Sequence, residues 1–172
     1  RKHKSEVANL PYSEPVKAYI AAQIEFDKAL ELLLNKLEEV GKLDDTVIAF
    51  VGYHYPYMLS LDQINEAATY KIDEVIEINR SNFALYNSKT KNTHITKVGS
   101  EIDVLPTIYN LFGINYDSRL IIGKDILSTE AGLAIFNNRS WVSDEGKYFA
   151  NNKKFVPNDN AVLDEDYIDE SA

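Results

Sequence analysis

Apolar side chains recur every three or four residues early in the chain, which is the spacing of one face of an α-helix. Ser13 can cap this helix, Pro15 is tolerated in its first turn, and Gly41 is a typical end signal. The pattern therefore predicts a helix from Glu14 to about Val40. Its core face is expected to carry Val16, Ile20, Ile24, Leu30, Leu34 and Leu37.

A short, unbroken apolar run follows this helix. Residues 46–51 (TVIAFV) are almost all β-branched or aromatic, which predicts a strand buried on both faces. Gly52 is expected to end this strand, and residues 53–57 (YHYPY) are expected to form the loop that follows. Open α/β sheets place their chemistry in loops at the carboxyl ends of their strands. We therefore expect the functional site in this loop.

The remaining pattern indicates shorter elements. It predicts a short helix over Leu61–Ala68 that Ser60 or Leu61 introduces, a strand over Asn82–Asn87, a helix over Asp103–Gly113 that Asp103 caps, and a strand pair over Leu133–Phe136 and Ser140–Ser143. Residues 70–79 are mixed in pattern and predict no single element. The alternation of helices and strands is typical of an α/β protein.

Composition narrows the classes of function. The 172 residues are 45% hydrophobic and 26% charged, as in a folded domain. The net charge of −9 argues against binding to a nucleic-acid backbone. Cysteine is absent, which removes disulfides and thiolate metal sites.

Chain organisation points to a single unit within a longer protein. The polar run at residues 88–92 is too short for a linker, so no domain boundary is expected there. No apolar run is long enough to span a membrane. The chain starts at Arg1 without a methionine, so we interpret it as a fragment with any anchor or targeting signal upstream. The acidic tail from Asn158 is expected to be a solvated end or a severed connection.

Few side chains are candidates for chemistry. Of the three histidines, His3 is expected to be solvated at the terminus and His94 to be an exposed residue of an edge strand. His54 follows the predicted buried strand, where an imidazole can bind a metal or shuttle a proton; the alternative is a packed aromatic loop. Asp27 falls near the apolar stripe of the first helix, and we expect it to make a structural hydrogen bond.

Four segments resemble one family. Residues 43–57 (LDDTVIAFVGYHYPY) are similar to the closing metal-binding segment of sulfatase-like enzymes of the alkaline phosphatase superfamily, in the branch of the lipoteichoic acid synthases. The helix before them (YIAAQIEFDKALELLLNKLEEVGKLDDT) resembles the same branch, as do EIDVLPTIYNLFGINYDSRLIIGKDILS and AIFNNRSWVSDEGKY downstream. The resemblance covers nearly the whole chain. It implies that residues 1–172 are the C-terminal part of a single sulfatase-like domain, with a partial doubly wound, mostly parallel sheet flanked by helices.

The resemblance assigns a role to one histidine. His54 matches the histidine of the family's Asp-His pair, which binds a divalent metal ion, with Mn²⁺ expected and Mg²⁺ or Zn²⁺ as alternatives. The aspartate position of that pair holds Tyr53. A carboxylate supplies a charged, hard oxygen ligand, whereas a phenol stays neutral near pH 7. Tyr53 therefore implies either impaired metal binding or an inactive or altered variant.

The resemblance leaves the catalytic residues unassigned. The family's threonine nucleophile and its other metal ligands belong to segments upstream of the matched part, and no threonine here matches the nucleophile motif. The implied function is the C-terminal segment of a metal-dependent phosphoglycerol or phosphoethanolamine transferase, or of a sulfatase-like hydrolase, which uses a covalent phospho-threonine intermediate at the cell envelope.

The implied partners follow from this function. They are the upstream half of the same domain and an anionic lipid or polymer substrate such as phosphatidylglycerol, with membrane attachment through an upstream anchor and no nucleic acid. The domain is expected to be extracytoplasmic. One alternative is a degenerate, metal-less sulfatase-like domain with a binding or structural role. The other is an unrelated α/β domain whose aromatic loop is only packed.

Overall fold

The computed structural model describes residues 2–159, 161, 163 and 167, so most of the predicted acidic tail lies outside the described residues. It divides into two compact units, residues 1–92 and 93–172. The division follows the polar run at residues 88–92, where the sequence predicted no boundary. The assignment of the whole chain to one domain stays a prediction.

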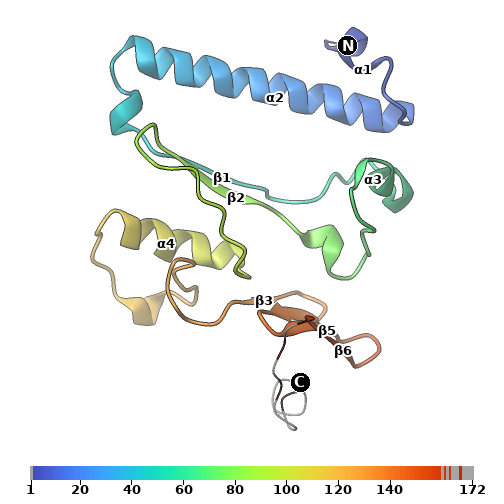
Figure 1. The fold of residues 1–172 in the computed structure, drawn as a ribbon, viewed down its shortest axis with the longest axis vertical. Helices are drawn as coiled ribbons and strands as arrows, with labels where there is room; N and C mark the ends of the chain where they lie inside the picture. Colours follow the sequence, from blue (N-terminus) through green and yellow to red (C-terminus); the bar gives the residue numbers. More distant parts are fainter. Residues whose placement is uncertain (1, 160, 162, 164–166, 168–172) are drawn as a thin grey trace. The chain divides into compact units, whose positions relative to one another are not determined.

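The first unit is built on one long helix and a small sheet (Figure 1). Its elements are α1 (Lys4–Val7), α2 (Glu14–Glu39), η1 (Leu43–Asp45), β1 (Ile48–Val51), α3 (Leu61–Ala67), η2 (Glu77–Asn79) and β2 (Phe83–Tyr86). The prediction of a helix over residues 14–40 is confirmed by α2, and Gly41 ends it in the left-handed conformation, at φ 65°. Val16 is fully buried, while the rest of the predicted core face is half-buried.

The two predicted helix caps in this unit differ in outcome. The hydroxyl of Ser13 makes no capping hydrogen bond. The backbone N–H of Ser13 instead donates to the carboxylate of Glu66 in α3, at 2.7 Å. The Ser13 prediction is therefore wrong in its chemistry. Ser60 forms a capping box with Gln63, whose backbone N–H donates to the Ser60 hydroxyl at 3.3 Å. This box starts α3 where the sequence predicted a helix.

Strands β1 and β2 pair antiparallel, from Ile48 opposite Tyr86 to Val51 opposite Phe83. Along β1 every second residue is exposed, because side chains alternate between the two faces of a strand and the described part of this unit packs α2 against only one of them. The prediction of a strand buried on both faces is therefore wrong. It relied on apolar composition, which does not show whether a second layer exists.

The expected mostly parallel sheet is also wrong, since both described sheets are antiparallel. The physical reason lies in the connection from β1 to β2. The chain leaves at the carboxyl end of β1 and returns at the same end, where Gly52 N–H donates to the Asn82 carbonyl at 3.2 Å and the Ser81 hydroxyl donates to the Gly52 carbonyl at 2.8 Å. Residues 53–80 therefore form a closed excursion rather than a crossover. The mixture of helices and sheets agrees with the predicted α/β class.

The second unit joins a short helix to a four-stranded meander. Its elements are η3 (Glu101–Asp103), α4 (Val104–Leu111), η4 (Ser118–Leu120), β3 (Leu133–Ile135), β4 (Trp141–Ser143), β5 (Gly146–Phe149) and β6 (Lys154–Pro157), with strand order β3-β4-β5-β6. The predicted strand pair is confirmed by β3 and β4, and Arg139 in their turn takes a φ of 67°. Trp141 stacks on Tyr148 at 5.5 Å between ring centroids and forms the buried centre of the meander.

The side chain of Asp103 stabilises the second unit, but it does not cap α4 as the sequence predicted. It stands at the N-cap of α4, but its carboxylate accepts instead from the backbone N–H of Ser100 and of Lys124, each at 2.7 Å. Gly123 lies so close to the Ile102 backbone that a Cβ would overlap the carbonyl. The buried carboxylate therefore ties the start of α4 to the loop at residues 123–124.

A histidine joins α1 to α2. His3 Nδ1 lies 2.6 Å from the Glu6 carboxylate and Nε2 lies 2.6 Å from that of Glu25. Lys2 pairs with Glu25 at 2.8 Å, and Lys28 approaches Glu6 at 3.3 Å and His3 Nδ1 at 3.1 Å. A ring with an acceptor at each nitrogen is satisfied only as imidazolium. Only about 10% of the His3 side chain is exposed, so the prediction of a solvated residue is wrong.

Replacing Asp103 with alanine should lower the free energy of unfolding of the second unit by about 2–4 kcal/mol, because the N–H groups of Ser100 and Lys124 lose their acceptor. Urea unfolding followed by the fluorescence of Trp141 reports this unit, since it holds the one tryptophan of the chain. The matched control is Glu101→Ala at an exposed neighbour, which should change the value by less than about 0.5 kcal/mol. Equal losses in the two variants would contradict a role for the buried carboxylate.

The contact of α1 with α2 should loosen as pH rises. Hydrogen bonds that His3 donates to Glu6 and then to Glu25 raise the pKa of His3, and those that Lys2 and His3 donate to Glu25 lower the pKa of Glu25 to about 2. A group whose pKa is higher in the folded state contributes full stability below its unfolded value, about 6.5, and loses it as pH passes its folded pKa. NMR titration should therefore give a His3 midpoint above 6.5, and the buried Val7 methyl groups should shift with the same midpoint.

The Glu25→Gln variant is the control for this titration, because it removes one carboxylate partner and should lower the His3 midpoint. A midpoint that is unchanged in the variant would show that the two groups do not pair in solution.

Candidate functional site

The loop that follows β1 is anchored at both ends. At its start, Gly52 lies against Ser81, and a Cβ on residue 52 would collide with the Ser81 hydroxyl. At its end, Leu59 N–H donates to the Pro56 carbonyl at 2.9 Å, and the Ser60 capping box then begins α3. The loop is thus a defined turn between a paired strand and a capped helix. The sequence predicted it in this place.

Four aromatic side chains of the loop contact one another. The His54 ring stacks on Tyr57 at a centroid distance of 4.3 Å and an interplanar angle of 15°. Tyr53 meets the edge of His54 at 5.5 Å, and Tyr55 meets Tyr57 edge-on at 4.7 Å. Such contacts are favourable for aromatic rings. Tyr53 nevertheless remains 84% exposed and Tyr57 63% exposed, so the cluster stands on the surface of its unit.

The hydrogen bond of His54 decides which of its nitrogens is free to react. Nδ1 lies 2.7 Å from the Tyr55 carbonyl oxygen. A carbonyl only accepts, so Nδ1 carries the proton and donates, and in the neutral ring the lone pair is on Nε2. A histidine held by a backbone carbonyl in this way is oriented as a metal ligand or a proton acceptor through Nε2.

The structure brings Tyr53 and His54 together but supplies no further ligand to them. Across residues 2–159 and the three described positions beyond, no group of three or more His, Cys, Asp or Glu side chains could hold a metal ion. One imidazole and one neutral phenol do not fit a divalent ion by themselves, because such sites combine several imidazole, carboxylate or thiolate donors. The predicted role of His54 and Tyr53 as metal residues stays a prediction.

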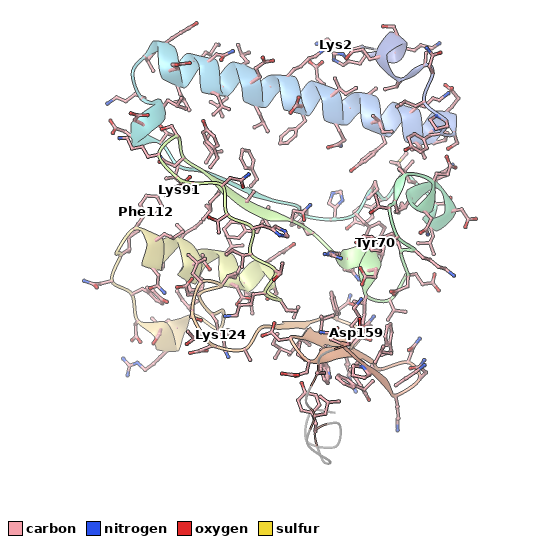
Figure 2. All side chains as sticks on the ribbon, in the orientation of Figure 1. Lys2, Tyr70, Lys91, Phe112, Lys124 and Asp159 are labelled. Atoms are coloured by element: carbon pink, nitrogen blue, oxygen red, sulfur yellow. The ribbon has the colours of Figure 1, made fainter. Side chains whose placement is uncertain are left out.

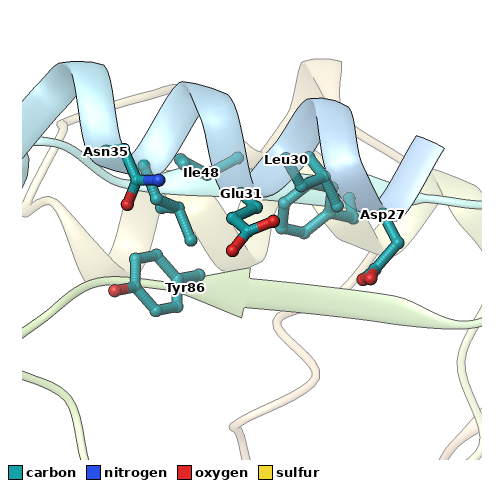
Figure 3. A pocket seen from close by; sticks show the side chains of 8 residues that line it. Asp27, Leu30, Glu31, Asn35, Ile48 and Tyr86 are labelled. Carbon is teal, nitrogen blue, oxygen red and sulfur yellow. The ribbon is translucent and has the colours of Figure 1, made fainter. Parts of the chain in front are cut away.

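A pocket lies between α2 and the β1–β2 sheet (Figure 3). It has a volume of about 320 Å³, an apolar lining that includes Leu30, Leu34, Ile48 and Phe50, and the polar side chains of Asp27 and Glu31. No hydrogen bond of Asp27 lies among the contacts of the described residues, so its predicted structural hydrogen bond stays a prediction. Glu31 was not a candidate at all; its spacing of four residues from Asp27 is the signal that could have found it.

The described helices include none that is long and apolar enough to cross a membrane.

Comparison with known proteins identifies relatives for most of the chain. The sequence model of the family described as Sulfatase matches residues 2–114. A lipoteichoic acid synthase from Staphylococcus saprophyticus is 31% identical over 140 residues, which is 77% of this chain and 21% of that protein. A lipoteichoic acid synthase from Staphylococcus aureus strain USA300 is 28% identical over 155 residues, 86% of this chain and 23% of that protein. The chain therefore spans about a fifth of the length of the curated relatives it matches.

The orientation of His54 yields a direct spectroscopic prediction. Long-range ¹H–¹⁵N spectra above the imidazole titration should show His54 as the Nδ1–H form, because the Tyr55 carbonyl holds that proton. The exposed His94 is the internal control and should show mainly the Nε2–H form, which free imidazoles prefer. A His54 spectrum matching that of His94 would mean that the carbonyl does not orient the ring.

Proposed function

Because the chain belongs to the sulfatase family, we propose that it forms part of an enzyme that transfers phosphoglycerol or phosphoethanolamine, or hydrolyses a related ester, at the cell envelope. In this proposal the chain contributes one wall of the active site, formed by the loop at residues 53–57. The observation that carries it is the position of His54, which follows the carboxyl end of β1 in a segment that the family model covers and whose Nε2 has no partner among the described residues.

The proposal gives His54 a defined task. Sulfatase-like families generally use divalent metals. His54 would supply a neutral nitrogen ligand through Nε2, while the Tyr55 carbonyl keeps the ring in the required tautomer. The other ligands and the nucleophile would come from outside this chain, since the described residues lack a metal cluster. We propose Mn²⁺, with Mg²⁺ or Zn²⁺ as alternatives, because a histidine beside oxygen ligands suits these ions.

The proposed partners follow from the same premise. We propose that the upstream part of the domain completes the site and that the substrate is an anionic lipid or polymer such as phosphatidylglycerol. An upstream anchor would attach the domain to the outer side of the cell membrane. The two relatives are named for the synthesis of lipoteichoic acid, a polymer of the cell envelope, which supports this assignment.

One observation favours a second function. Tyr53 stands where the family pattern has aspartate, and its ring packs against His54 at 5.5 Å instead of presenting a charged oxygen. A neutral phenol does not replace the charge that a carboxylate contributes to a divalent-metal site. The second candidate is accordingly a degenerate, metal-less sulfatase-like domain that binds or stabilises a partner.

A chimera separates the two functions. The segment of Staphylococcus aureus lipoteichoic acid synthase that aligns with this chain is replaced by the chain itself, with Tyr53 or with Tyr53→Asp, and lipoteichoic acid synthesis is measured in cells. Synthesis by the Tyr53 chimera would support the enzymatic function. Synthesis by the Tyr53→Asp chimera alone would support the degenerate domain, and we expect that change to raise synthesis at least tenfold because it restores a charged ligand, worth about 1.4 kcal/mol or more.

The control is His54→Ala in the Tyr53→Asp chimera, which should abolish the gain. Equal synthesis with and without His54, at equal protein abundance, would exclude the proposed role of this loop. The absence of synthesis from both full-length, membrane-localised chimeras would overturn the enzymatic proposal for this chain.

A further inference from the structure

The imidazole of His54 is restrained from two directions by its own loop. Nδ1 lies 2.7 Å from the Tyr55 carbonyl oxygen, and one face of the ring stacks on Tyr57 at a centroid distance of 4.3 Å and an interplanar angle of 15°. The hydrogen bond selects the edge of the ring that faces the backbone, but by itself it leaves the ring free to tilt about that bond. A parallel ring against one face opposes the tilt. The two contacts together therefore fix the direction of Nε2.

Tyr57 is itself held in place by local structure. The Leu59 N–H donates to the Pro56 carbonyl at 2.9 Å, which closes a β-turn with Tyr57 at its second position. The half-buried Tyr55 meets the Tyr57 ring edge-on at 4.7 Å and an interplanar angle of 82°. The side chains of this segment stand along the connection from β1 to α3 (Figure 2). Tyr57 can thus restrain His54 although 63% of Tyr57 is exposed.

The other ring beside His54 does not restrain it in this way. Tyr53 meets the imidazole at 5.5 Å and an interplanar angle of 69°, and 84% of Tyr53 is exposed. Among the described residues its one ring contact is with His54, so no further ring supports it from behind. An edge-on contact also leaves the face of the imidazole uncovered. The stack with Tyr57 is therefore the contact that sets the plane of the imidazole.

We propose that Tyr57 is a positioning residue for His54. Its ring holds the imidazole in the plane in which Nδ1 donates to the Tyr55 carbonyl and Nε2 stays available to a ligand from outside the loop. Holding the ring in place before a metal ion arrives removes the cost of ordering it on binding. This inference rests on the proposed function, in which Nε2 binds the metal, and extends it to a residue that acts only through His54.

The first test measures the tautomer of His54 in the 172-residue chain and needs no metal. Long-range ¹H–¹⁵N spectra of the neutral ring are compared between the unchanged chain, Tyr57→Leu and Tyr57→Phe. We expect the ratio of the Nδ1–H form to the Nε2–H form to fall about fivefold in Tyr57→Leu, which corresponds to about 1 kcal/mol of lost stacking. Tyr57→Phe keeps an aromatic ring and should retain the ratio within about twofold. That pair of results would support the proposal.

Met58→Ala is the matched control, because Met58 occupies the next position of the same turn and is 93% exposed. It should leave the tautomer ratio unchanged. An unchanged ratio in Tyr57→Leu would overturn the proposal, and so would an equal fall in Tyr57→Phe or Met58→Ala. A fall accompanied by changed amide signals in β1 and α3 would overturn it as well, because Tyr57 would then support the loop rather than the imidazole.

The second test places the same variants in the Tyr53→Asp chimera with the Staphylococcus aureus lipoteichoic acid synthase. At equal protein abundance, we expect Tyr57→Leu to lower lipoteichoic acid synthesis about fivefold and Tyr57→Phe to retain it. Unchanged synthesis in Tyr57→Leu, beside a shifted tautomer ratio, would overturn the positioning role. The absence of synthesis from every chimera would count against the proposed function instead, and the tautomer ratios would then decide whether Tyr57 positions the ring.

Discussion

The pairing of β1 with β2 is the constraint on which the first unit depends. The ladder from Ile48–Tyr86 to Val51–Phe83 continues into the Gly52–Asn82 hydrogen bond, and this closes the excursion that carries the aromatic loop and α3. The same register directs Ile48, Phe50 and Tyr86 toward the pocket beneath α2. A shift of one residue would send these side chains to the opposite face and would turn the loop as well. The site and the pocket are therefore two consequences of one ladder.

The second unit is stabilised differently. Buried polar side chains form hydrogen bonds with backbone groups of its loops. Asp103 accepts from Ser100 and Lys124, and the hydroxyl of the buried Thr107 accepts from Ile126 N–H at 2.9 Å while it donates to the Asp103 carbonyl at 2.6 Å. Such bonds satisfy loop groups that no strand or helix can satisfy. They explain why the segment at residues 121–128, which has no regular secondary structure, keeps a defined course.

Many large apolar side chains are exposed in both units. Met58 in the first unit is 93% exposed, and Leu120 and Ile122 in the second are 82% and 90% exposed. Single exposed apolar residues are common on monomers, but groups of them mark surfaces that receive a partner. The chain covers only 21–23% of the relatives it matches, and the rest of such a protein could cover these exposed side chains.

The sequence by itself determined the elements whose signals are local. The 3.6-residue periodicity and Gly41 predicted α2 almost to the residue, and the start of α3 after Ser60 and the β3–β4 strand pair lie where residue preferences predicted them. The family resemblance, confirmed by the comparisons, also came from local motifs, and with it the singling out of Tyr53 and His54. These features depend on neighbours in the chain, so their causes are visible in the order of residues.

Only the tertiary structure decided what depends on distant neighbours. Three features contradicted expectation: the antiparallel pairing of β1 with β2, the exposure of one face of β1, and the hydrogen bond from Lys124 N–H to the Asp103 carboxylate. Each depends on a segment tens of residues away or on the absence of a second layer in the described structure. His3 is held against α2 because Glu25 of that helix contacts its Nε2 in space. The tautomer of His54 likewise follows from a three-dimensional contact, that of Nδ1 with the Tyr55 carbonyl, since hydrogen-bond partners are chosen by proximity and not by composition.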